Sequence, residues 1–562
     1  MSINLHPDIP LVPDDVTLHQ FIFGTHCMRP QRPEHAPWLI DDETGVKYSE
    51  QELKERTLAL STALQRRFSL KSDDVVVLLS GNHIEPSQDY PVCIWATQCF
   101  LGIVAPTNPA FTVPELTKHL GFVKASLVIT QSDLLPTVEK AAKQAGILFD
   151  RIVTINEHED RTSIPRLIQE GRLLPPAKEY TLAPGDNKKK IAFYNTSSGT
   201  TGPPKVVKIS HHAIIANVLL MAAHNRIHLS YTPRAEKRYR VGDSCLAVLP
   251  LYHIYGLNAI LHFNIFAGLS VVIAPKFNFS NMLSSIARHR ITHLMLVPPQ
   301  VVLLCKDPAV KSYDLSSVRA ILCGASALPA ELFEQLLSLF PHAHVGQAYG
   351  ATEVTGTASM HPITDKQNPY CGTFVPGVSG RVVRADGSTA SPNEEGELHI
   401  KTVAAASGYL HNEDATSETF LEGGWIRSGD IVRIDALGNV VVVDRVKVRG
   451  FQVAPAELEG TILDSPLVDD VCVVPIFDTY SGELPLAYVV PSQLAKTMIN
   501  NGESKKVKQT IMQHVAVNKA RFKHLARLEF TENLPRTASG KLLRRDLRER
   551  AKRLSSYNTV RL

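Results

Sequence analysis

Short apolar stretches alternate with amphipathic stretches over residues 53–154, and this alternation restricts the possible folds more than any other feature of the chain. Leu and Ala recur at helical spacing through residues 53–68, and residues 73–80 then form an apolar run that is typical of a buried strand. Further helices are predicted at residues 93–101, 113–123 and 134–145, and further strands at 102–106, 126–130 and 151–154. Strands that alternate with helices pair in parallel and are covered on both faces, so the sequence predicts an α/β fold.

The length of the chain indicates how many domains to expect, and its net charge indicates which classes of partner to expect. With 562 residues the chain exceeds what one hydrophobic core usually serves, so two or more domains are expected. The formal net charge is +4, which is small for this length and gives no reason to expect binding to nucleic acid or to an anionic membrane surface. The eight cysteines are scattered without CxxC spacing and are expected to be reduced thiols of an intracellular protein.

The chain ends and one apolar segment bear on the location of the protein. No basic stretch precedes an apolar run at the beginning of the chain, so no signal peptide is expected and the predicted location is the cytoplasm. Residues 244–275 lack Asp, Glu, Lys and Arg, but Pro250 and His253 interrupt them, and a buried strand–helix–strand is predicted instead of a membrane span. The terminal Val560-Arg561-Leu562 approximates a peroxisomal address, and the alternative is an ordinary chain end.

A loop rich in hydroxyl groups lies between two apolar strands that are predicted at residues 190–194 and 206–210. It carries five Ser or Thr residues and two glycines between Thr196 and Gly202, and Lys205 adds a positive charge. Hydroxyl and backbone N–H groups can close around an anion, so the loop is predicted to bind a polyphosphate. The alternative is a flexible surface turn, which is the usual meaning of such a composition. The arrangement is strand–loop–strand and differs from the strand–loop–helix of the GxxxxGK[ST] motif.

The loop sequence SSGTTGPPK, residues 197–205, resembles the AMP-binding signature of the adenylate-forming enzymes. These include acyl-CoA synthetases, 4-coumarate-CoA ligases, luciferases and the adenylation domains of peptide synthetases. Further segments are similar to family motifs in the same order, at residues 248–256, 320–328, 346–353, 396–400, 408–410, 424–430, 440–459 and 534–541. The resemblance is strongest to the 4-coumarate-CoA ligase-like acyl-CoA synthetases. It implies a large N-terminal domain of parallel or mixed sheets with covering helices at residues 1–444, and a small mobile α+β domain at 445–562.

The resemblance also implies a reaction and the molecules that take part in it. A carboxylic acid would react with ATP, with the help of Mg²⁺, to form an acyl-adenylate and pyrophosphate, and coenzyme A would then take the acyl group. The implied catalytic residues are Lys541, His253, Thr352 and Glu353, and the implied ligands of the metal are Thr200 and Glu353. The acyl pocket would be formed by Tyr252, His253, Ala325, Ala348 and Val354.

The residues implied to contact ATP or coenzyme A come from all of these motifs. Tyr349 would stack on adenine, Asp430 would accept hydrogen bonds from the ribose hydroxyls, and Lys541 would reach the carboxylate and the α-phosphate. The full set is Thr196, Ser197, Ser198, Gly199, Thr200, Thr201, Gly202, Lys205, Gly324, Ala325, Ser326, Gln347, Ala348, Tyr349, Gly350, Thr352, Asp430, Arg445, Lys447, Gly450, Phe451, Gln452 and Lys541.

Two departures from the family pattern affect what the resemblance implies. Ala348 stands where the family usually has glycine, and the additional methyl group is expected to narrow the acyl pocket. The segment that joins Arg445 to Lys447 is shorter than in the relatives, which affects the junction between the two domains.

Three alternative functions remain open from the sequence. The chain could be an acyl-AMP ligase that loads the carrier protein of a polyketide or peptide synthase instead of coenzyme A. It could be a ligand-binding relative without activity, although every catalytic position is filled, or an oxidative enzyme of the luciferase type. The sequence does not specify the acid.

Overall fold

The computed structural model describes residues 10–82, 89–177, 179–197, 205–229, 233, 236–325, 328, 330–362, 368–384, 386–444, 447–448, 451–453, 455–478, 482–535 and 544–556. The chain divides into two compact units. The larger unit holds most of residues 1–443, and the smaller holds residues 444–562 together with the stretches Ala110–Leu116 and Ser197–Lys205. The domain limits 1–444 and 445–562 stay a prediction.

A six-stranded sheet in the order β6-β5-β3-β4-β7-β8 contains the first strands of the α/β alternation. Its strands are β3 (Val75–Leu79), β4 (Ile103–Thr107), β5 (Ala125–Thr130), β6 (Ile152–Thr154), β7 (Ile191–Ser197) and β8 (Lys205–Ser210). β3 pairs in parallel with β4 and β5, β5 with β6, and β4 with β7. All five residues of β3 are buried, as expected for a parallel strand that is covered on both faces.

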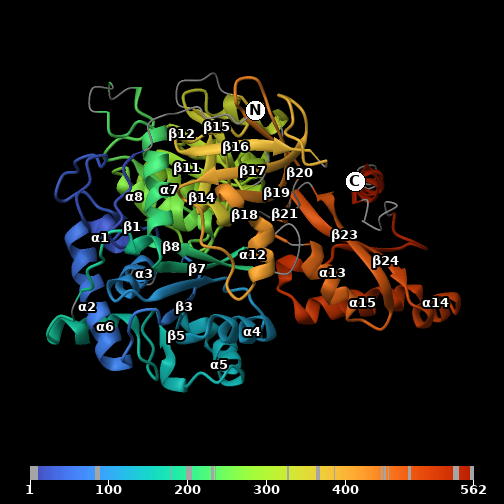
Figure 1. Ribbon diagram of the computed structural model, residues 1–562, viewed down its shortest axis with the longest axis horizontal. Helices are drawn as coiled ribbons and strands as arrows, with labels where there is room; N and C mark the ends of the chain where they lie inside the picture. Colours follow the sequence, from blue (N-terminus) through green and yellow to red (C-terminus); the bar gives the residue numbers. More distant parts are fainter. Residues whose placement is uncertain are drawn as a thin grey trace. The chain divides into compact units, whose positions relative to one another are not determined.

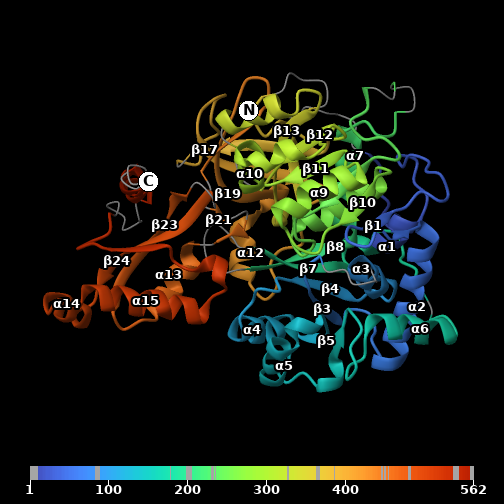
Figure 2. The same ribbon diagram turned by 180° about the vertical axis from the view of Figure 1, so that it is seen from behind.

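Helices cover both faces of this sheet, as the sequence predicts. Figures 1 and 2 show α3 (Asp89–Cys99) on one face and α4 (Val113–Val123) and α5 (Leu135–Gln144) on the other. The outer helix α2 (Glu50–Phe68) contacts α3 and α6 (Ile164–Leu173). A capping box fixes the start of α2: Ser49 Oγ accepts from the Glu52 N–H, and Glu52 Oε2 accepts from the Ser49 N–H at 2.8 Å.

A nine-stranded sheet in the order β15-β14-β13-β12-β11-β9-β10-β1-β2 forms the centre of the larger unit. The strands from β13 to β1 in this order are parallel, and β14, β15 and β2 add antiparallel edges. The strands are β1 (Leu39–Asp41), β2 (Lys47–Tyr48), β9 (Ser244–Ala247), β10 (Ser270–Ile273), β11 (His293–Leu296), β12 (Ala320–Cys323), β13 (His344–Ala351), β14 (Gly356–Met360) and β15 (Thr373–Phe374).

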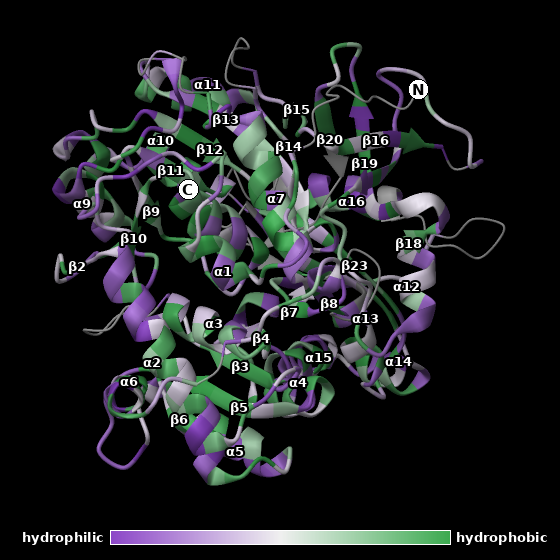
Figure 3. Ribbon diagram, turned by 60° about the vertical axis from the view of Figure 1, so that its left-hand side comes forward, coloured by the Kyte–Doolittle hydropathy of each residue, from purple (hydrophilic) through white to green (hydrophobic). Residues whose placement is uncertain are grey.

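The helices of this sheet also lie on two faces. Figures 1 and 2, seen from opposite sides, show α7 (His211–His224) and α8 (Asn264–Phe266) on one face and α9 (Phe279–His289) and α10 (Pro298–Lys306) on the other. Two further helices of the larger unit are α1 (Leu18–Phe23) and α11 (Ala330–Leu339). Figure 3 shows that β3, β5 and β12 are hydrophobic, whereas α5 and α9 carry both hydrophilic and hydrophobic residues.

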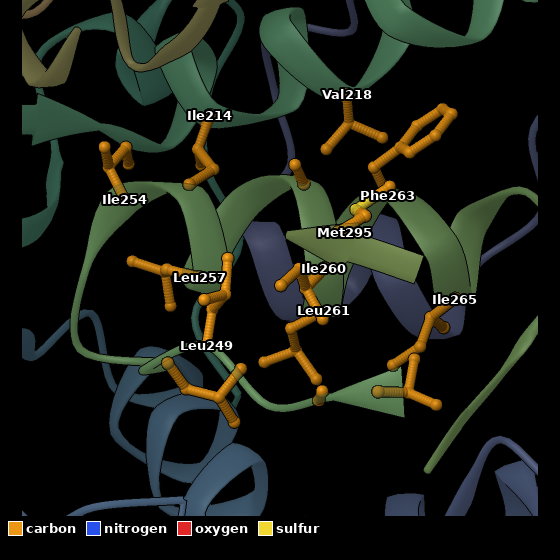
Figure 4. Packing of buried hydrophobic residues seen from close by; sticks show 14 of the residues in the cluster. Ile214, Val218, Leu249, Ile254, Leu257, Ile260, Leu261, Phe263, Ile265 and Met295 are labelled. Atoms are coloured by element: carbon orange, nitrogen blue, oxygen red, sulfur yellow. The ribbon is translucent and has the colours of Figure 1, made fainter. Parts of the chain in front are cut away.

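The segment without charged residues, 244–275, is the buried strand–helix–strand that the sequence predicts. It runs from β9 through a π-helix, η5 (Tyr255–Phe263), and α8 into β10. Figure 4 shows Leu257, Ile260 and Phe263 of this π-helix packed among apolar side chains that include Ile214 and Val218 of α7. No helix in the described part of the chain has both the length and the apolar character that a membrane span requires.

A third sheet follows, in the order β16-β17-β19-β18, with β20 paired to β19. The pairings of β16 with β17, β17 with β19 and β18 with β19 are antiparallel. The elements are β16 (Val378–Val383), β17 (Gly396–Thr402), α12 (Glu413–Thr419), β18 (Phe420–Leu421), β19 (Trp425–Ile434) and β20 (Val440–Asp444). The larger unit therefore combines parallel and antiparallel strands, which agrees with the predicted parallel or mixed sheets.

The smaller unit is a separate α+β body with its own hydrophobic core. Its sheet has the order β22-β21-β24-β23, with β25 paired in parallel to β24, and α13, α15 and α16 pack near it. Val507, Ile511 and Val515 of α15 are fully buried in this core. The elements are β21 (Lys447–Val448), β22 (Phe451–Gln452), α13 (Pro455–Leu463), β23 (Val468–Asp478), β24 (Gly482–Pro491), α14 (Gln493–Asn500), α15 (Ser504–Asn518), β25 (Arg527–Phe530) and α16 (Arg544–Ser556).

Candidate active site

Tyr349 and Asp430 meet although they are 81 residues apart in the chain. Tyr349 lies on β13 of the nine-stranded sheet, and Asp430 lies on β19 of the antiparallel sheet. The Tyr349 hydroxyl donates to Asp430 Oδ2 at 2.7 Å, and both side chains are buried. A buried carboxylate needs such donors because it has lost its hydration. The fold therefore brings together two residues that the sequence assigns to the adenosine of ATP.

Thr352 and Glu353 follow β13 in a single turn of 3₁₀-helix, η7 (Thr352–Val354). Thr355 ends the turn in the left-handed region, with φ of 60°. The Glu353 carbonyl accepts from the Ala406 N–H at 2.9 Å, and Glu353 Oε1 accepts from the Tyr409 hydroxyl at 2.9 Å. Both the backbone and the side chain of Glu353 are thus held by the segment 406–409.

The same segment is attached to the strand that leaves the hydroxyl-rich loop. The Lys208 N–H donates to the Gly408 carbonyl at 2.9 Å, and the Ser407 N–H donates to the Lys208 carbonyl at 2.7 Å. An isolated antiparallel bridge pairs Val207 with Tyr409. Glu353 and the strand β8 are therefore connected through one short piece of chain.

The beginning of the hydroxyl-rich loop is connected to the segment that carries His253. Asn195, near the end of β7, donates from Nδ2 to the Tyr252 carbonyl at 3.3 Å. His253 Nδ1 accepts from the Tyr255 N–H at 3.2 Å, at the start of η5. Since a backbone N–H can only donate, Nδ1 carries no proton, and a neutral His253 keeps its proton on Nε2.

Tyr255 fills the space beside the turn after β12. Its hydroxyl donates to the Leu322 carbonyl at 3.0 Å, and a Cβ atom at Gly324 would lie 3.2 Å from its ring. Ala325 follows with φ of 67°, a conformation that is uncommon for a residue with a side chain. Of the residues assigned to the acyl pocket, Val354 is buried, and Tyr252, His253, Ala325 and Ala348 are partly buried.

The amide of Gln347 is engaged by two loops. Its Oε1 accepts from the Leu328 N–H at 2.8 Å, and its Nε2 donates to the Pro369 carbonyl at 2.6 Å. The side chain is buried. Gln347 therefore holds the backbone at Leu328 and Pro369 in addition to any contact with a ligand.

Burial keeps several hydroxyl groups of this region protonated. It raises the pKa of Tyr252 and of Tyr255. The pKa of Tyr409 is raised first by burial and then by the negative charge of Glu353. These phenols consequently remain hydrogen-bond donors at neutral pH.

Several residues that the sequence predicts lie outside the described residues. They are Ser198, Gly199, Thr200, Thr201, Gly202, Ser326, Arg445, Gly450 and Lys541. Lys205 begins β8, as the predicted strand–loop–strand requires, but Thr196 and Ser197, which the sequence analysis assigned to the loop, are the last residues of β7. Lys447 pairs with Gln452, and Val448 with Phe451, in the hairpin of β21 and β22.

Sequence reasoning missed two side chains of this region, Tyr255 and Tyr409. Tyr255 follows His253 by two residues at the start of a helix, and that spacing could have suggested a common site. Tyr409 belongs to the GYL segment, which the sequence analysis noted without giving it a role. Its contact with Glu353 spans 56 residues, and no local pattern indicates it.

Comparison with known proteins agrees with the fold and with the order of the motifs. Residues 28–410 match the model of the AMP-binding enzyme family, and residues 457–541 match the AMP-binding enzyme C-terminal domain. The chain is 33% identical over 559 residues to 4-coumarate-CoA ligase 1 of Narcissus pseudonarcissus, which covers 97% of this chain and 95% of that protein. It is also 33% identical over 564 residues to 4-coumarate--CoA ligase 2 of Oryza sativa subsp. japonica, with 96% and 93% covered.

A solved structure shares the fold at lower sequence identity. The amide bond synthetase McbA from Marinactinospora thermotolerans superposes with a TM-score of 0.76 and 19% identity, over 95% of this chain and 99% of that one. That likeness concerns the fold; the match to the two family models and the curated relatives that match along nearly the whole chain show that the protein is a member of the AMP-binding enzyme family.

Proposed function

We propose that the protein is an ATP-dependent carboxylic acid–CoA ligase of the AMP-forming type. The observation that carries this proposal is the hydrogen bond between the Tyr349 hydroxyl and Asp430. The strand that carries Tyr349 leads into the turn that contains Thr352 and Glu353. A site for adenosine that is followed by the Thr352 hydroxyl and the Glu353 carboxylate suits a reaction at the α-phosphate of ATP. The 4-coumarate-CoA ligases that match along nearly the whole chain support the same activity.

The reaction has two steps. A carboxylate oxygen of the acid attacks the α-phosphorus of ATP, a new O–P bond forms, and the bond to the β-phosphate breaks, so that pyrophosphate leaves. The thiol of coenzyme A then attacks the acyl carbon, the bond from that carbon to the AMP oxygen breaks, and the thiol proton passes to solvent. The first step brings two anions together, so positive charge and hydrogen-bond donors near the α-phosphate lower its barrier.

We assign roles to the described residues with support from the contacts that the structure gives them. Tyr349 holds Oδ2 of Asp430, and we assign that carboxylate to the ribose hydroxyls, since an ordered carboxylate accepts hydrogen bonds from hydroxyl groups. Thr352 offers a hydroxyl to the α-phosphate. His253, whose Nδ1 is held by the Tyr255 N–H, keeps Nε2–H as a donor for the acid or the phosphate. We assign Lys541 to adenylation from the resemblance, and Lys447 and the residues after it to the thiol step.

A divalent cation fits the donor set. Glu353 offers one carboxylate in the turn that follows β13, the strand that carries Tyr349. Mg²⁺ commonly binds through one or two carboxylates together with the phosphates of its substrate, so a single carboxylate suits a metal that arrives with ATP. Bound there, Mg²⁺ would neutralise phosphate charge that opposes the attacking carboxylate. We assign Glu353 and Thr200 as its ligands.

The test is a panel of carboxylic acids, including hydroxycinnamic, medium-chain and branched acids, assayed for pyrophosphate release with and without coenzyme A. We expect release that depends on the acid, and acyl-CoA detected by mass spectrometry without any carrier protein. Acyl-adenylate that is transferred only to a phosphopantetheinylated carrier would favour the acyl-AMP ligase. No release with any acid would contradict the proposal.

The location is a separate part of the proposal. We place the protein in the cytoplasm, with Val560-Arg561-Leu562 as the alternative peroxisomal address. A fluorescent protein carrying the last residues of this chain tests the address, because import into peroxisomes would show that the tripeptide is recognised.

A further inference from the structure

The Tyr409 hydroxyl contacts the carboxylate to which the proposed function assigns the metal. It donates to Glu353 Oε1 at 2.9 Å, and the Thr419 side chain is a second hydrogen-bond partner. The ring is buried and meets Phe420 edge-on, with ring centroids 5.6 Å apart. Its hydroxyl is therefore held by packing as well as by hydrogen bonds.

The backbone around Tyr409 is fixed on two sides, by β8 and by α12. Leu410 N–H donates to the Val206 carbonyl at 2.8 Å, and the Tyr409 N–H donates to Thr416 Oγ1 at 3.0 Å. Gly408 has φ of 98°, and a Cβ atom there would lie 2.7 Å from Thr416 Cγ2. Only glycine allows the chain to pass α12 this closely. The position of Tyr409 is thus determined by β8 and α12 before any ligand binds.

We propose that Tyr409 is a positioning residue for the divalent cation: it holds the Glu353 carboxylate in the orientation that receives the metal carried by ATP. The inference rests on the proposed function of Glu353. A carboxylate on a single 3₁₀ turn has several rotamers, and a fixed donor on one oxygen reduces them before binding. The segment 406–410 is hydrogen-bonded to β8, the strand that leaves the hydroxyl-rich loop. This segment therefore fixes the position of Glu353 relative to β8.

The test measures metal binding directly. Mn²⁺ is titrated into the full-length protein with α,β-methylene-ATP, which cannot be cleaved at the bond that adenylation breaks, and free Mn²⁺ is followed by electron paramagnetic resonance. We expect Tyr409→Phe to weaken Mn²⁺ binding on the order of tenfold, since a hydrogen bond to a charged group is lost while the ring remains. In acid-dependent pyrophosphate release, the half-saturating Mg²⁺ concentration should rise while kcat at saturating Mg²⁺ changes little.

Two control variants separate positioning from general loss of structure. Thr419→Val removes a second partner of the hydroxyl and keeps the bond to Glu353, so Mn²⁺ affinity should stay within about twofold of wild type. Tyr488→Phe removes a buried hydroxyl of the smaller unit that has no hydrogen-bond partner among the described residues, and it should not change Mn²⁺ affinity. If Tyr409→Phe weakens binding no more than these controls, the inference is wrong.

Glu353→Gln distinguishes failure of the inference from failure of the proposed function. If Glu353→Gln binds Mn²⁺ as wild type does, Glu353 is not a metal ligand and the function assigned to it fails. If it weakens binding, Tyr409→Phe in the Glu353→Gln background should add almost nothing, because both changes act through one carboxylate. Additive losses would contradict the inference.

A measurement on the wild-type protein does not depend on how any variant folds. A crystal structure with α,β-methylene-ATP and Mg²⁺ should keep the Tyr409 hydroxyl within hydrogen-bonding distance of the Glu353 carboxylate. A hydroxyl detached from that carboxylate in the complex would overturn the inference.

Discussion

The Tyr349 hydroxyl lies 2.7 Å from Asp430 Oδ2, and this hydrogen bond links the nine-stranded sheet to the antiparallel sheet inside the larger unit. The two side chains are 3% and 0% exposed, so neither can exchange its partner for water in the free protein. The bond fixes the carboxylate that we assign to the ribose.

Tyr349→Phe tests this bond. The variant keeps the ring but leaves a buried carboxylate with one donor fewer, which should lower the free energy of unfolding by about 1–3 kcal/mol. The KM for ATP should rise more than kcat falls, because the ribose site becomes less well ordered. Thermal unfolding and initial rates over a range of ATP concentrations measure both effects. An unchanged KM for ATP would remove Asp430 from the ribose site.

Ala348→Gly tests the acyl pocket. Removing the methyl group should widen the pocket and raise kcat/KM for wider acids relative to slim ones, by up to about 1–3 kcal/mol or roughly 10–200-fold. The ratio between acids is the measured quantity, because glycine also weakens a strand and lowers absolute rates. The same order of preference among acids in both proteins would show that Ala348 does not line the pocket.

The pH dependence of stability should reflect His262, which lies in the π-helix η5. Trp95 Nε1 donates to His262 Nε2 at 3.2 Å, and the ring's Nδ1–H donates to the Leu257 carbonyl at 2.6 Å, so the neutral ring is satisfied. Burial lowers its pKa from 6.5 to about 4, against a smaller raising effect of the Leu257 carbonyl. The unfolded chain therefore binds a proton below pH 6.5 that the folded chain does not bind until about pH 4.

Stability should thus decrease as the pH falls from 6.5 towards 4, with His262 contributing up to about 1.4 kcal/mol per pH unit. His262→Gln removes the titrating group, so the free energy of unfolding should depend less on pH in this window, although the variant is less stable at neutral pH. Urea unfolding at several pH values gives both slopes. If the free energy of unfolding depends on pH equally in the two proteins, His262 is not the group that titrates in this window.

Much of the architecture follows from local sequence patterns. The predicted helix at residues 113–123 has the bounds of α4, and the apolar run at 73–80 contains β3. These elements follow from the spacing of apolar residues, which reports how a segment is buried. The π-helix η5 could not be distinguished from an α-helix in this way, since almost all its residues are buried and no polar face sets a period.

The candidate site could be predicted as a set of residues but not as a set of contacts. The motifs place Tyr349, Asp430 and Glu353 in one site through resemblance, and the structure adds the bonds that hold them. Tyr349 with Asp430 and Tyr409 with Glu353 join distant segments whose approach depends on how the sheets pack. The spacing of apolar residues within one segment does not indicate which distant segment it will contact.

Gly350→Ala tests whether the close approach of β13 and β14 supports the site. A Cβ atom at Gly350 would lie 2.0 Å from the Gly356 carbonyl oxygen, so the two strands must separate directly beside Tyr349 and Thr352. We expect the variant to lose about 1–3 kcal/mol of stability through overpacking and to release pyrophosphate more slowly at every ATP concentration. Gly460→Ala is the matched control, because among the described residues no atom outside its own helix backbone lies within 4 Å of its Cβ position in α13, and alanine favours a helix by about 1 kcal/mol. Equal rates and melting temperatures for Gly350→Ala and wild type would show that the hairpin can open without disturbing the residues assigned to ATP.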